Sequence, residues 1–211
     1  IDAFEEAKHV YFQGNNLIER INSNIKHDFI IGETGFGAGR ILVSMIDSLS
    51  KSESKNINII YNSVELHPIT PDRMALILDS FKEKAGQFIN LLINEYKTID
   101  ISKPGLHQLK LKLSFGNIIL NLWLGEALEM VNNLTIPCDA WFLDGHGPKK
   151  NPLMWRAELL KSIGDKTVTG GTFATFTVAV EVTRALINAG FVPEQFPGFG
   201  RKRAVLKGKK R

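Results

Sequence analysis

Residues 29–40 read FIIGETGFGAGR, and this stretch decides the fold of the chain. Residues 29–31 form an apolar run typical of a buried strand, and the next turn has glycine at every second position: Gly35, Gly37 and Gly39. Apolar residues from Ile41 to Leu49 then recur with helical spacing. The pattern predicts a strand, a tight turn and a helix whose first N–H groups point at a ligand.

The glycine spacing fits neither of the two common phosphate-binding loops, G-x-G-x-x-G and G-x-x-x-x-G-K-[ST]. Glu33 comes just before the glycines, where a carboxylate repels phosphate but can hold a ligand that carries an ammonium or sulfonium charge. S-adenosylmethionine is such a ligand. The alternative is a glycine-rich turn that only packs a helix on a sheet.

The length of 211 residues fits one α/β domain with a full core. The single cysteine, Cys138, excludes an intramolecular disulfide, and no apolar run approaches the ~20 residues of a membrane span. We therefore expect a cytoplasmic protein. The five histidines and the cysteine show no ligand spacing, so we expect no metal.

The positive charge is concentrated at the end of the chain. Residues 201–211 hold seven basic and no acidic side chains, which leaves 19 basic and 22 acidic residues in the rest. Such a cluster suits phosphate groups of nucleic acid, although solvated basic termini are also common.

The remaining elements follow in an α/β order. We expect a hairpin-like N-terminal flap over residues 1–27, with two short strands between His9 and Ile25, and a second hairpin over residues 109–124. One helix is predicted to begin at Pro71 with Thr70 as its N-cap, and another to run from Phe88 to Tyr96.

Four acids are each predicted at the carboxyl end of a strand: Glu33, Glu65, Glu126 and Asp144. In an open parallel sheet these ends form one crevice, where ligands bind. Glu65 is placed to accept from both hydroxyls of a ribose, although an ordinary surface glutamate remains an alternative. Residues 145–155 (GHGPKKNPLMW) then read as an active-site lid.

Six blocks of the sequence, in order, resemble one family. They are ETGFGAG, SVELHPIT, LNLWLGE, DAWFLDGHGPKKNPLMW, GGTFATFT and GFGRKR. Together they resemble the methyltransferase domain of the bifunctional enzyme that makes 5-methylaminomethyl-2-thiouridine in tRNA. The resemblance runs from about Val10 to Gly208.

This resemblance implies a class I, Rossmann-like methyltransferase domain over residues 28–211. The expected sheet is mostly parallel and seven-stranded, with an antiparallel last strand. The implied reaction moves a methyl group from S-adenosylmethionine to the aminomethyl group of the wobble uridine. We expect a stand-alone form without the flavin-dependent oxidase domain, which leaves a separate oxidase or an upstream tRNA-modifying complex as a candidate partner.

The resemblance also implies a set of site residues. The cofactor-binding residues are Glu33, Gly35, Phe36, Gly37, Gly39, Glu65, Leu66, Gly125, Glu126 and Asp144. Asp144 is expected to hold the substrate amine, and His146, which stands where the family has phenylalanine, either assists it or only fills space. The expected tRNA contacts are Lys149, Lys150, Phe176, Arg201, Lys202, Arg203, Lys207, Lys209, Lys210 and Arg211.

The chemistry needs little beyond positioning, because methyl transfer is a displacement at a sulfonium by an amine lone pair. Trp155, Phe173 and Phe176 are candidates for stacking on the uridine, and core packing is the alternative for each. Two other functions stay open at this point. One is methylation of a small-molecule or protein amine, and the other is a non-catalytic binding module.

Overall fold

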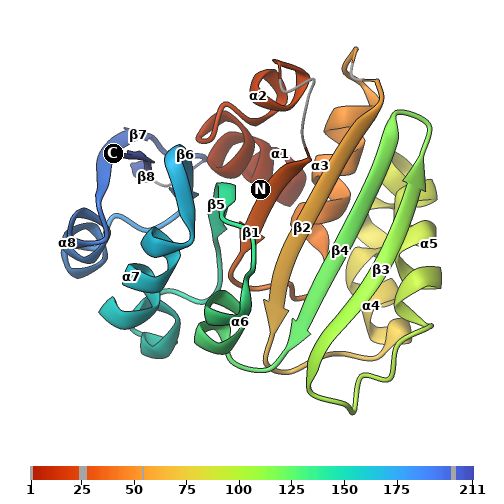
Figure 1. The fold of residues 1–211 in the computed structure, drawn as a ribbon. Coiled ribbons are helices and arrows are strands. Elements are labelled where there is room, and N and C mark those ends of the chain that lie inside the picture. The colour runs from red at the N-terminus through yellow and green to blue at the C-terminus, as the bar shows by residue number, and fades with distance from the viewer. Residues whose placement is uncertain (1, 24–27, 54, 201–202) are drawn as a thin grey trace.

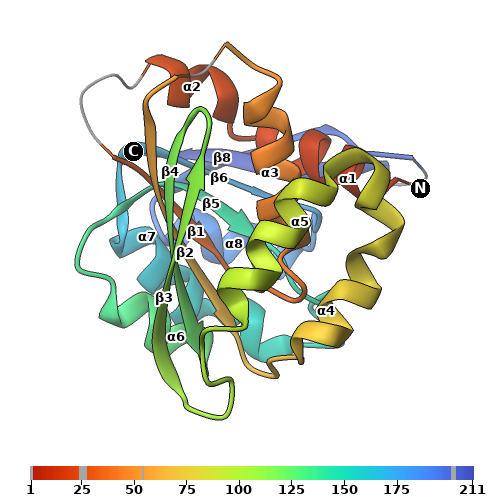
Figure 2. The same ribbon diagram turned by 90° about the vertical axis from the view of Figure 1, so that its right-hand side faces the viewer.

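The computed structural model describes residues 2–23, 28–53, 55–200 and 203–211. An open, twisted sheet crosses the molecule and carries helices on both faces (Figures 1 and 2). Within the described ranges the sheet has eight strands in the order β3-β4-β2-β1-β5-β6-β8-β7. Their bounds are β1 Phe29–Glu33, β2 Ile57–Glu65, β3 Gly105–Leu113, β4 Gly116–Leu124, β5 Cys138–Leu143, β6 Thr167–Thr175, β7 Phe191–Pro197 and β8 Ala204–Lys210.

The central strands β4, β2, β1, β5 and β6 run parallel to one another. β8 is antiparallel to both β6 and β7, which confirms the predicted antiparallel last strand. The expected number of seven strands is wrong, because β3 pairs antiparallel with β4 and extends the sheet at one edge. This β3–β4 hairpin is the one predicted over residues 109–124.

Helices α3, α4 and α5 follow the predicted order. The α-helices are α1 Ala3–Ala7, α2 Leu17–Ser23, α3 Arg40–Ser50, α4 Pro71–Leu78, α5 Lys82–Tyr96, α6 Ala127–Asn133, α7 Ala157–Asp165 and α8 Val180–Asn188. Shorter turns are η1 Lys8–Gln13, a π-helix, and the 3₁₀-helices η2 Asp79–Phe81 and η3 Pro152–Trp155. Thr70 caps α4 as predicted, since its hydroxyl accepts from the Arg73 N–H. α5 begins six residues before the predicted Phe88.

The apolar strands separate two cores. Phe29 and Ile31 point into the core under α1, α3, α4 and α5, whereas Ile30 points into the core under α6, α7 and α8. Figure 2 shows the two helix layers on either side of the sheet. A strand that is buried on both faces needs apolar residues at every position, which explains the continuous apolar run at the start of β1.

The predicted N-terminal hairpin is wrong, because the described part of residues 1–27 is helical. The apolar residues Phe4, Ala7 and Tyr11 follow helical spacing, and all three are buried in the core under α3. Asp2 caps α1 by accepting from the Phe4 N–H at 2.9 Å. The β-branched and aromatic content of residues 10–12 favoured strands, and packing against α3 overrode it. The domain boundary expected at residue 27 lies outside the described residues.

Candidate active site

The loop between β1 and α3 has the backbone that its glycines predicted. Gly37 and Gly39 have φ of 56° and 74°, in the left-handed region that favours glycine. A side chain at Gly39 would collide with Leu92 and with the ring of Phe36, so glycine lets the loop pack on α5. At Gly37 an added Cβ would meet nothing within 4 Å, because this residue faces a cavity.

This cavity, which we call the cofactor cavity, has a volume of about 750 Å³ and lies at the carboxyl ends of the parallel strands. Most of the residues predicted to bind the cofactor line it together: Gly35, Gly37, Glu65, Leu66, Gly125, Glu126 and Asp144. They come from the turns after β1, β2, β4 and β5. The predicted crevice is therefore present.

Glu65 bridges two loops of the cofactor cavity. One carboxylate oxygen accepts from the Gly37 N–H and the other accepts from the His67 N–H, both at 2.8 Å. Each oxygen of a carboxylate has two acceptor positions, so both can still accept from a ribose hydroxyl. Glu65 therefore both lines the cavity and holds the glycine loop through the Gly37 N–H.

Glu126 is the N-cap residue of α6, and its carboxylate lies 3.7 Å from the guanidinium of Arg156. Its side chain is 40% exposed, so the carboxylate remains open to the cofactor cavity. An acceptor at this position suits an amino group of a ligand.

Glu33 is not among the residues that line the cofactor cavity, although the sequence predicted that it contacts the cofactor. Its side chain is fully buried, and its Oε2 accepts from the Ser63 hydroxyl at 2.5 Å. Its Oε1 has no hydrogen-bond partner among the described residues. Burial raises the pKa of Glu33 to about 8, which favours the protonated carboxyl.

Phe36 and Gly39 also stay outside the cavity lining. The Phe36 ring is buried and stacks on Tyr96 with the ring centroids 6.3 Å apart. Its backbone N–H donates to the Val64 carbonyl at 2.9 Å, which ties the glycine loop to β2. Phe36 and Gly39 therefore shape the loop from behind.

A second cavity, which we call the amine cavity, has a volume of about 590 Å³ and lies beside the first. Its walls come from α1, η1, the loop after β5 and the start of α8. The residues shared by both cavities are Arg40, Asp144, Gly145, His146 and Lys150. Asp144 therefore stands between a cofactor-sized and a nucleoside-sized space.

The Asp144 carboxyl is held in a mixed environment. Burial raises its pKa, whereas the Tyr11 hydroxyl, the Gly145 N–H and the positive charge of Arg40 lower it. Its backbone carbonyl accepts from the Thr34 hydroxyl at 2.9 Å, which fixes the end of β5 against the glycine loop. An acid with this balance can bind an ammonium group and also take a proton from it.

The predicted lid, residues 145–155, forms the common border of the two cavities. The Trp155 indole N–H donates to the His146 carbonyl at 2.8 Å, and the Trp155 ring meets Phe176 edge to face at 5.7 Å. The His146 side chain is exposed. Trp155 and Phe173 are buried, which supports core packing for both, while Phe176 lines the amine cavity.

The predicted tRNA contacts lie at the two opposite ends of the strands. Lys149 and Lys150 line the amine cavity and are exposed. β8 runs away from the crevice, because Leu206 pairs with Thr175 at the crevice end of β6 and Lys209 pairs with Thr172 further down.

Arg203 therefore lies near the crevice. The side of the sheet away from the crevice, at the other end of the strands, holds Lys209, Lys210 and Arg211. Lys207 pairs with Glu194 at 3.2 Å, and Lys210 donates to the Ala189 carbonyl at the end of α8. Arg201 and Lys202 lie outside the described residues.

Glu6, Tyr11 and Arg40 line the amine cavity and were not among the site residues predicted from the sequence. Arg40 follows the last glycine directly, and this position was the available signal. Glu6 and Tyr11 lie in the segment that was wrongly expected to be a hairpin.

In the ranges that the structure describes, no helix is long and apolar enough to cross a membrane. No three His, Cys, Asp or Glu side chains of these ranges gather in a way that could hold a metal ion.

Comparison with known proteins agrees with this geometry. The family model described as S-adenosyl-L-methionine-dependent methyltransferase matches residues 83–211. The tRNA 5-methylaminomethyl-2-thiouridine biosynthesis bifunctional protein MnmC of Pseudomonas entomophila is 36% identical over 208 residues, which cover 98% of this chain and 31% of that protein. The protein of the same name from Caulobacter vibrioides is 34% identical over 206 residues, which cover 98% and 34%. The chain thus spans about a third of the length of these relatives.

Among solved structures, MnmC2 of Aquifex aeolicus superimposes with a TM-score of 0.74 at 20% identity, covering 98% of this chain and 60% of that one. Spermidine synthase of Thermotoga maritima gives a TM-score of 0.57 at 10% identity, covering 100% and 60%. These two likenesses concern the fold. With the family match, they confirm the predicted class I fold and the predicted cofactor. The chain belongs to the family of S-adenosyl-L-methionine-dependent methyltransferases.

Proposed function

We propose that the chain methylates the aminomethyl group of 5-aminomethyl-2-thiouridine at the wobble position of tRNA, which gives 5-methylaminomethyl-2-thiouridine. The observation that carries the proposal is the meeting of the cofactor cavity and the amine cavity at Asp144. The relatives named for the biosynthesis of this nucleoside support it, because their similarity covers 98% of the chain.

The residues of the cofactor cavity fit S-adenosylmethionine. The glycine loop allows close approach to the backbone, Glu65 offers both oxygens to the ribose diol, and Glu126 offers an acceptor to an amino group. When bound, this cofactor supplies a methyl group on a positively charged sulfur. Glu33 lies in the core and accepts from the Ser63 hydroxyl, which joins β1 to β2.

The amine cavity supplies orientation and a proton acceptor. An alkylamine is mostly protonated at neutral pH, so Asp144 first pairs with the ammonium and then takes one of its protons. Asp144 holds the freed lone pair toward the cofactor cavity, where a bound cofactor would give up its methyl group by cleavage of the methyl–sulfur bond and would leave as a neutral thioether. The proton on Asp144 leaves to solvent through the cavity. Positioning and exclusion of water account for most of the rate, and no covalent enzyme intermediate is needed.

The same proposal names the partners. Lys149, Lys150 and Arg203 lie near the crevice and are placed to meet phosphates beside the wobble nucleotide. The substrate must be made by an upstream reaction that leaves a primary amine on the uridine, either by a separate flavin-dependent oxidase or by a tRNA-modifying complex. Action on tRNA in this setting places the protein in the cytoplasm.

The test is methylation of bulk tRNA from a strain that lacks this modification, with S-adenosylmethionine labelled in its methyl group. The proposal expects label in 5-methylaminomethyl-2-thiouridine after nuclease digestion, and no label in tRNA whose aminomethyl group has been acetylated. Turnover of a free amine or a protein amine at a comparable rate, without transfer to tRNA, would overturn the assignment of the substrate. Failure to bind S-adenosylmethionine would leave only a binding module with this fold.

A further inference from the structure

One face of the N-terminal helical segment is turned toward Asp144. The residues of α1 and η1 that line the amine cavity are Ala3, Glu6, Ala7, Val10 and Tyr11. They recur every three or four positions, as the residues on one side of a helix do. This face therefore brings one carboxylate and one phenol to the cavity that holds Asp144.

Tyr11 is built into the structure beside Asp144. Its side chain is only 5% exposed. Its ring packs on Phe142, which lies two residues before Asp144, with the ring centroids 5.6 Å apart. The Tyr11 pKa is raised by burial and by the charge and hydrogen bond of Asp144. The phenol therefore stays protonated and acts as a hydrogen-bond donor to that carboxylate.

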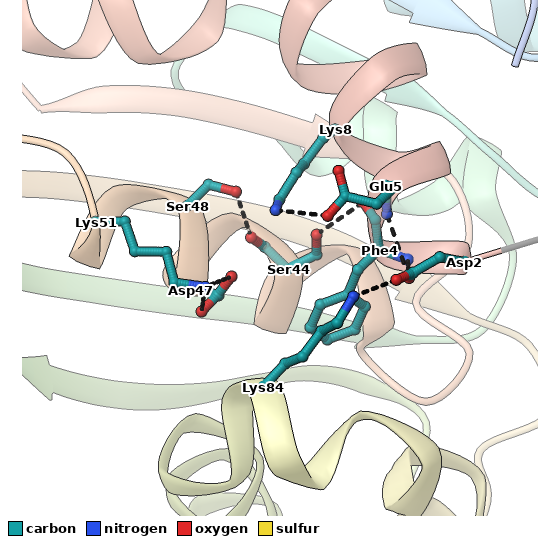
Figure 3. A network of polar contacts seen from close by, with 9 residues as sticks. All are labelled: Asp2, Phe4, Glu5, Lys8, Ser44, Asp47, Ser48, Lys51 and Lys84. Atoms are coloured by element: carbon teal, nitrogen blue, oxygen red, sulfur yellow. Dashed lines mark hydrogen bonds and ion pairs between the residues drawn. The ribbon is translucent and has the colours of Figure 1, made fainter.

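The backbone of this segment is fixed from two sides. Asn15 donates through its amide group to the Tyr11 carbonyl at 2.9 Å and to the Trp141 carbonyl at 3.3 Å. At the other end, Ser44 of α3 donates to the Phe4 carbonyl and Lys84 of α5 pairs with Asp2 (Figure 3). Phe4 also stacks on Phe81 with the ring centroids 4.3 Å apart. Glu6 and Tyr11 are thus held between anchored ends.

We propose that Glu6 and Tyr11 complete the amine site: Tyr11 positions the Asp144 carboxylate, and Glu6 is a second carboxylate that selects a positively charged amine. This inference rests on the proposed function and deepens it. A cavity with two carboxylates favours a ligand with a full positive charge and disfavours a ligand whose amine carries an added carboxylate.

The two residues act on Asp144 in opposite directions. The negative charge of Glu6 raises the pKa of Asp144, whereas the Tyr11 hydroxyl lowers it. Several other ionisable groups line the amine cavity or interact with Asp144 across the packed elements: Glu33, Arg40, Tyr61, His146, Lys149, Lys150 and Glu181. None of these groups changes in the variants below, so the direction of each shift belongs to the substituted residue.

The experiment is the pH profile of kcat/KM for the aminomethyl-uridine tRNA, measured for the wild type, Glu6→Gln and Tyr11→Phe. The acid limb reports ionisation of Asp144 in the free enzyme. We expect Glu6→Gln to move this limb to lower pH and to lower kcat/KM about 10-fold. We expect Tyr11→Phe to move it to higher pH and to lower kcat about 10-fold.

Glu5→Gln is the matched control, because Glu5 is on the same helix, pairs with Lys8 and does not line the cavity. Its profile should match the wild type. Thermal unfolding shows which variants fold, and if Tyr11→Phe does not, the direction of the Glu6→Gln limb decides alone. Acid limbs that coincide for wild type, Glu6→Gln and Tyr11→Phe would overturn the inference.

Calorimetry with the free nucleoside 5-aminomethyl-2-thiouridine, with S-adenosylhomocysteine present, separates this inference from the proposed function. Glu6→Gln should weaken binding of this nucleoside about 10-fold and leave 2-thiouridine unchanged. If the wild type does not methylate tRNA but shows this dependence on Glu6, the amine site stands and the proposed function fails. If tRNA is methylated and neither readout depends on Glu6 or Tyr11, the amine site proposed here is wrong.

Discussion

At the scale of single residues, the acids at the strand ends have separated roles because they point in different directions. Glu65, Glu126 and Asp144 reach the cofactor cavity, whereas Glu33 turns into the core beneath it. Side chains alternate along a strand, so Glu33 shares the face of Phe29 and Ile31. This alternation could have been read from the sequence.

Glu65→Gln should weaken S-adenosylmethionine binding by about 1–3 kcal/mol, because it removes a charged acceptor from the ribose and from the Gly37 N–H. Isothermal calorimetry measures the effect. Glu83→Gln is the control, since Glu83 is exposed on α5 and does not line the cofactor cavity. Equal affinities of wild type and Glu65→Gln, with both proteins folded, would remove Glu65 from the cofactor site.

The buried Glu33 should make stability fall as pH rises. Its folded-state pKa, about 8, lies above the ordinary value of 4.5, so the folded protein binds the proton more tightly than the unfolded chain does. The contribution is complete below about pH 4.5 and is lost as pH rises through about 8. Urea unfolding from pH 6 to 9 should therefore show a smaller decline for Glu33→Gln than for the wild type. A decline that stays as steep in Glu33→Gln would mean that other groups cause it.

At the scale of elements, the sequence predicted those parts whose signals are local. The glycine loop, the α4 cap at Thr70, the β3–β4 hairpin and the end of β5 at Asp144 were all found. The N-terminal helices were missed because residues 10–12 have strand propensity and their burial against α3 is a long-range contact. The direction of β8, which carries its lysines away from the crevice, also depends on pairing with distant strands.

Asn15 should be the main tie of the N-terminal segment to the sheet. It is 1% exposed, donates to the carbonyls of Tyr11 and Trp141 and accepts from the Thr172 hydroxyl at 2.6 Å. Asn15→Ala removes these three side-chain hydrogen bonds and should lower the free energy of unfolding by about 2–4 kcal/mol in urea titrations. Asn94→Ala, at an exposed position on α5, should change it by less than about 0.5 kcal/mol. Similar values for the two variants would contradict the role of Asn15.

At the scale of the whole molecule, the cofactor cavity lies on one side of Asp144 and the amine cavity on the other. Basic residues lie both at the crevice and at the opposite end of the strands, although the sequence shows only one basic tail. The position of a charge relative to the crevice therefore decides its use. Under the proposed function, a wobble nucleotide in the amine cavity would bring its flanking phosphates to Lys149, Lys150 and Arg203.

Charge reversal should distinguish the basic residues at the crevice from those at the opposite end of the strands. Lys149→Glu with Lys150→Glu should weaken binding of all tRNAs and flatten the dependence of log affinity on log salt by up to about 0.7–0.9 per lost contact. Lys209→Glu with Arg211→Glu should have the smaller effect, because these residues lie away from the crevice. Binding of labelled tRNA at several salt concentrations gives both slopes. A larger change in affinity and salt slope for the second pair would place the tRNA at the end of the strands away from the crevice.

The central claim is that Asp144 holds the substrate amine where the two cavities meet. The most direct test is single-turnover transfer to aminomethyl-uridine tRNA by Asp144→Ala, with S-adenosylmethionine affinity measured on the same protein. The account predicts a loss of the order of 10²–10⁴ in the transfer rate with cofactor affinity nearly unchanged. Near-normal transfer, or a loss of cofactor affinity in step with activity, would contradict it.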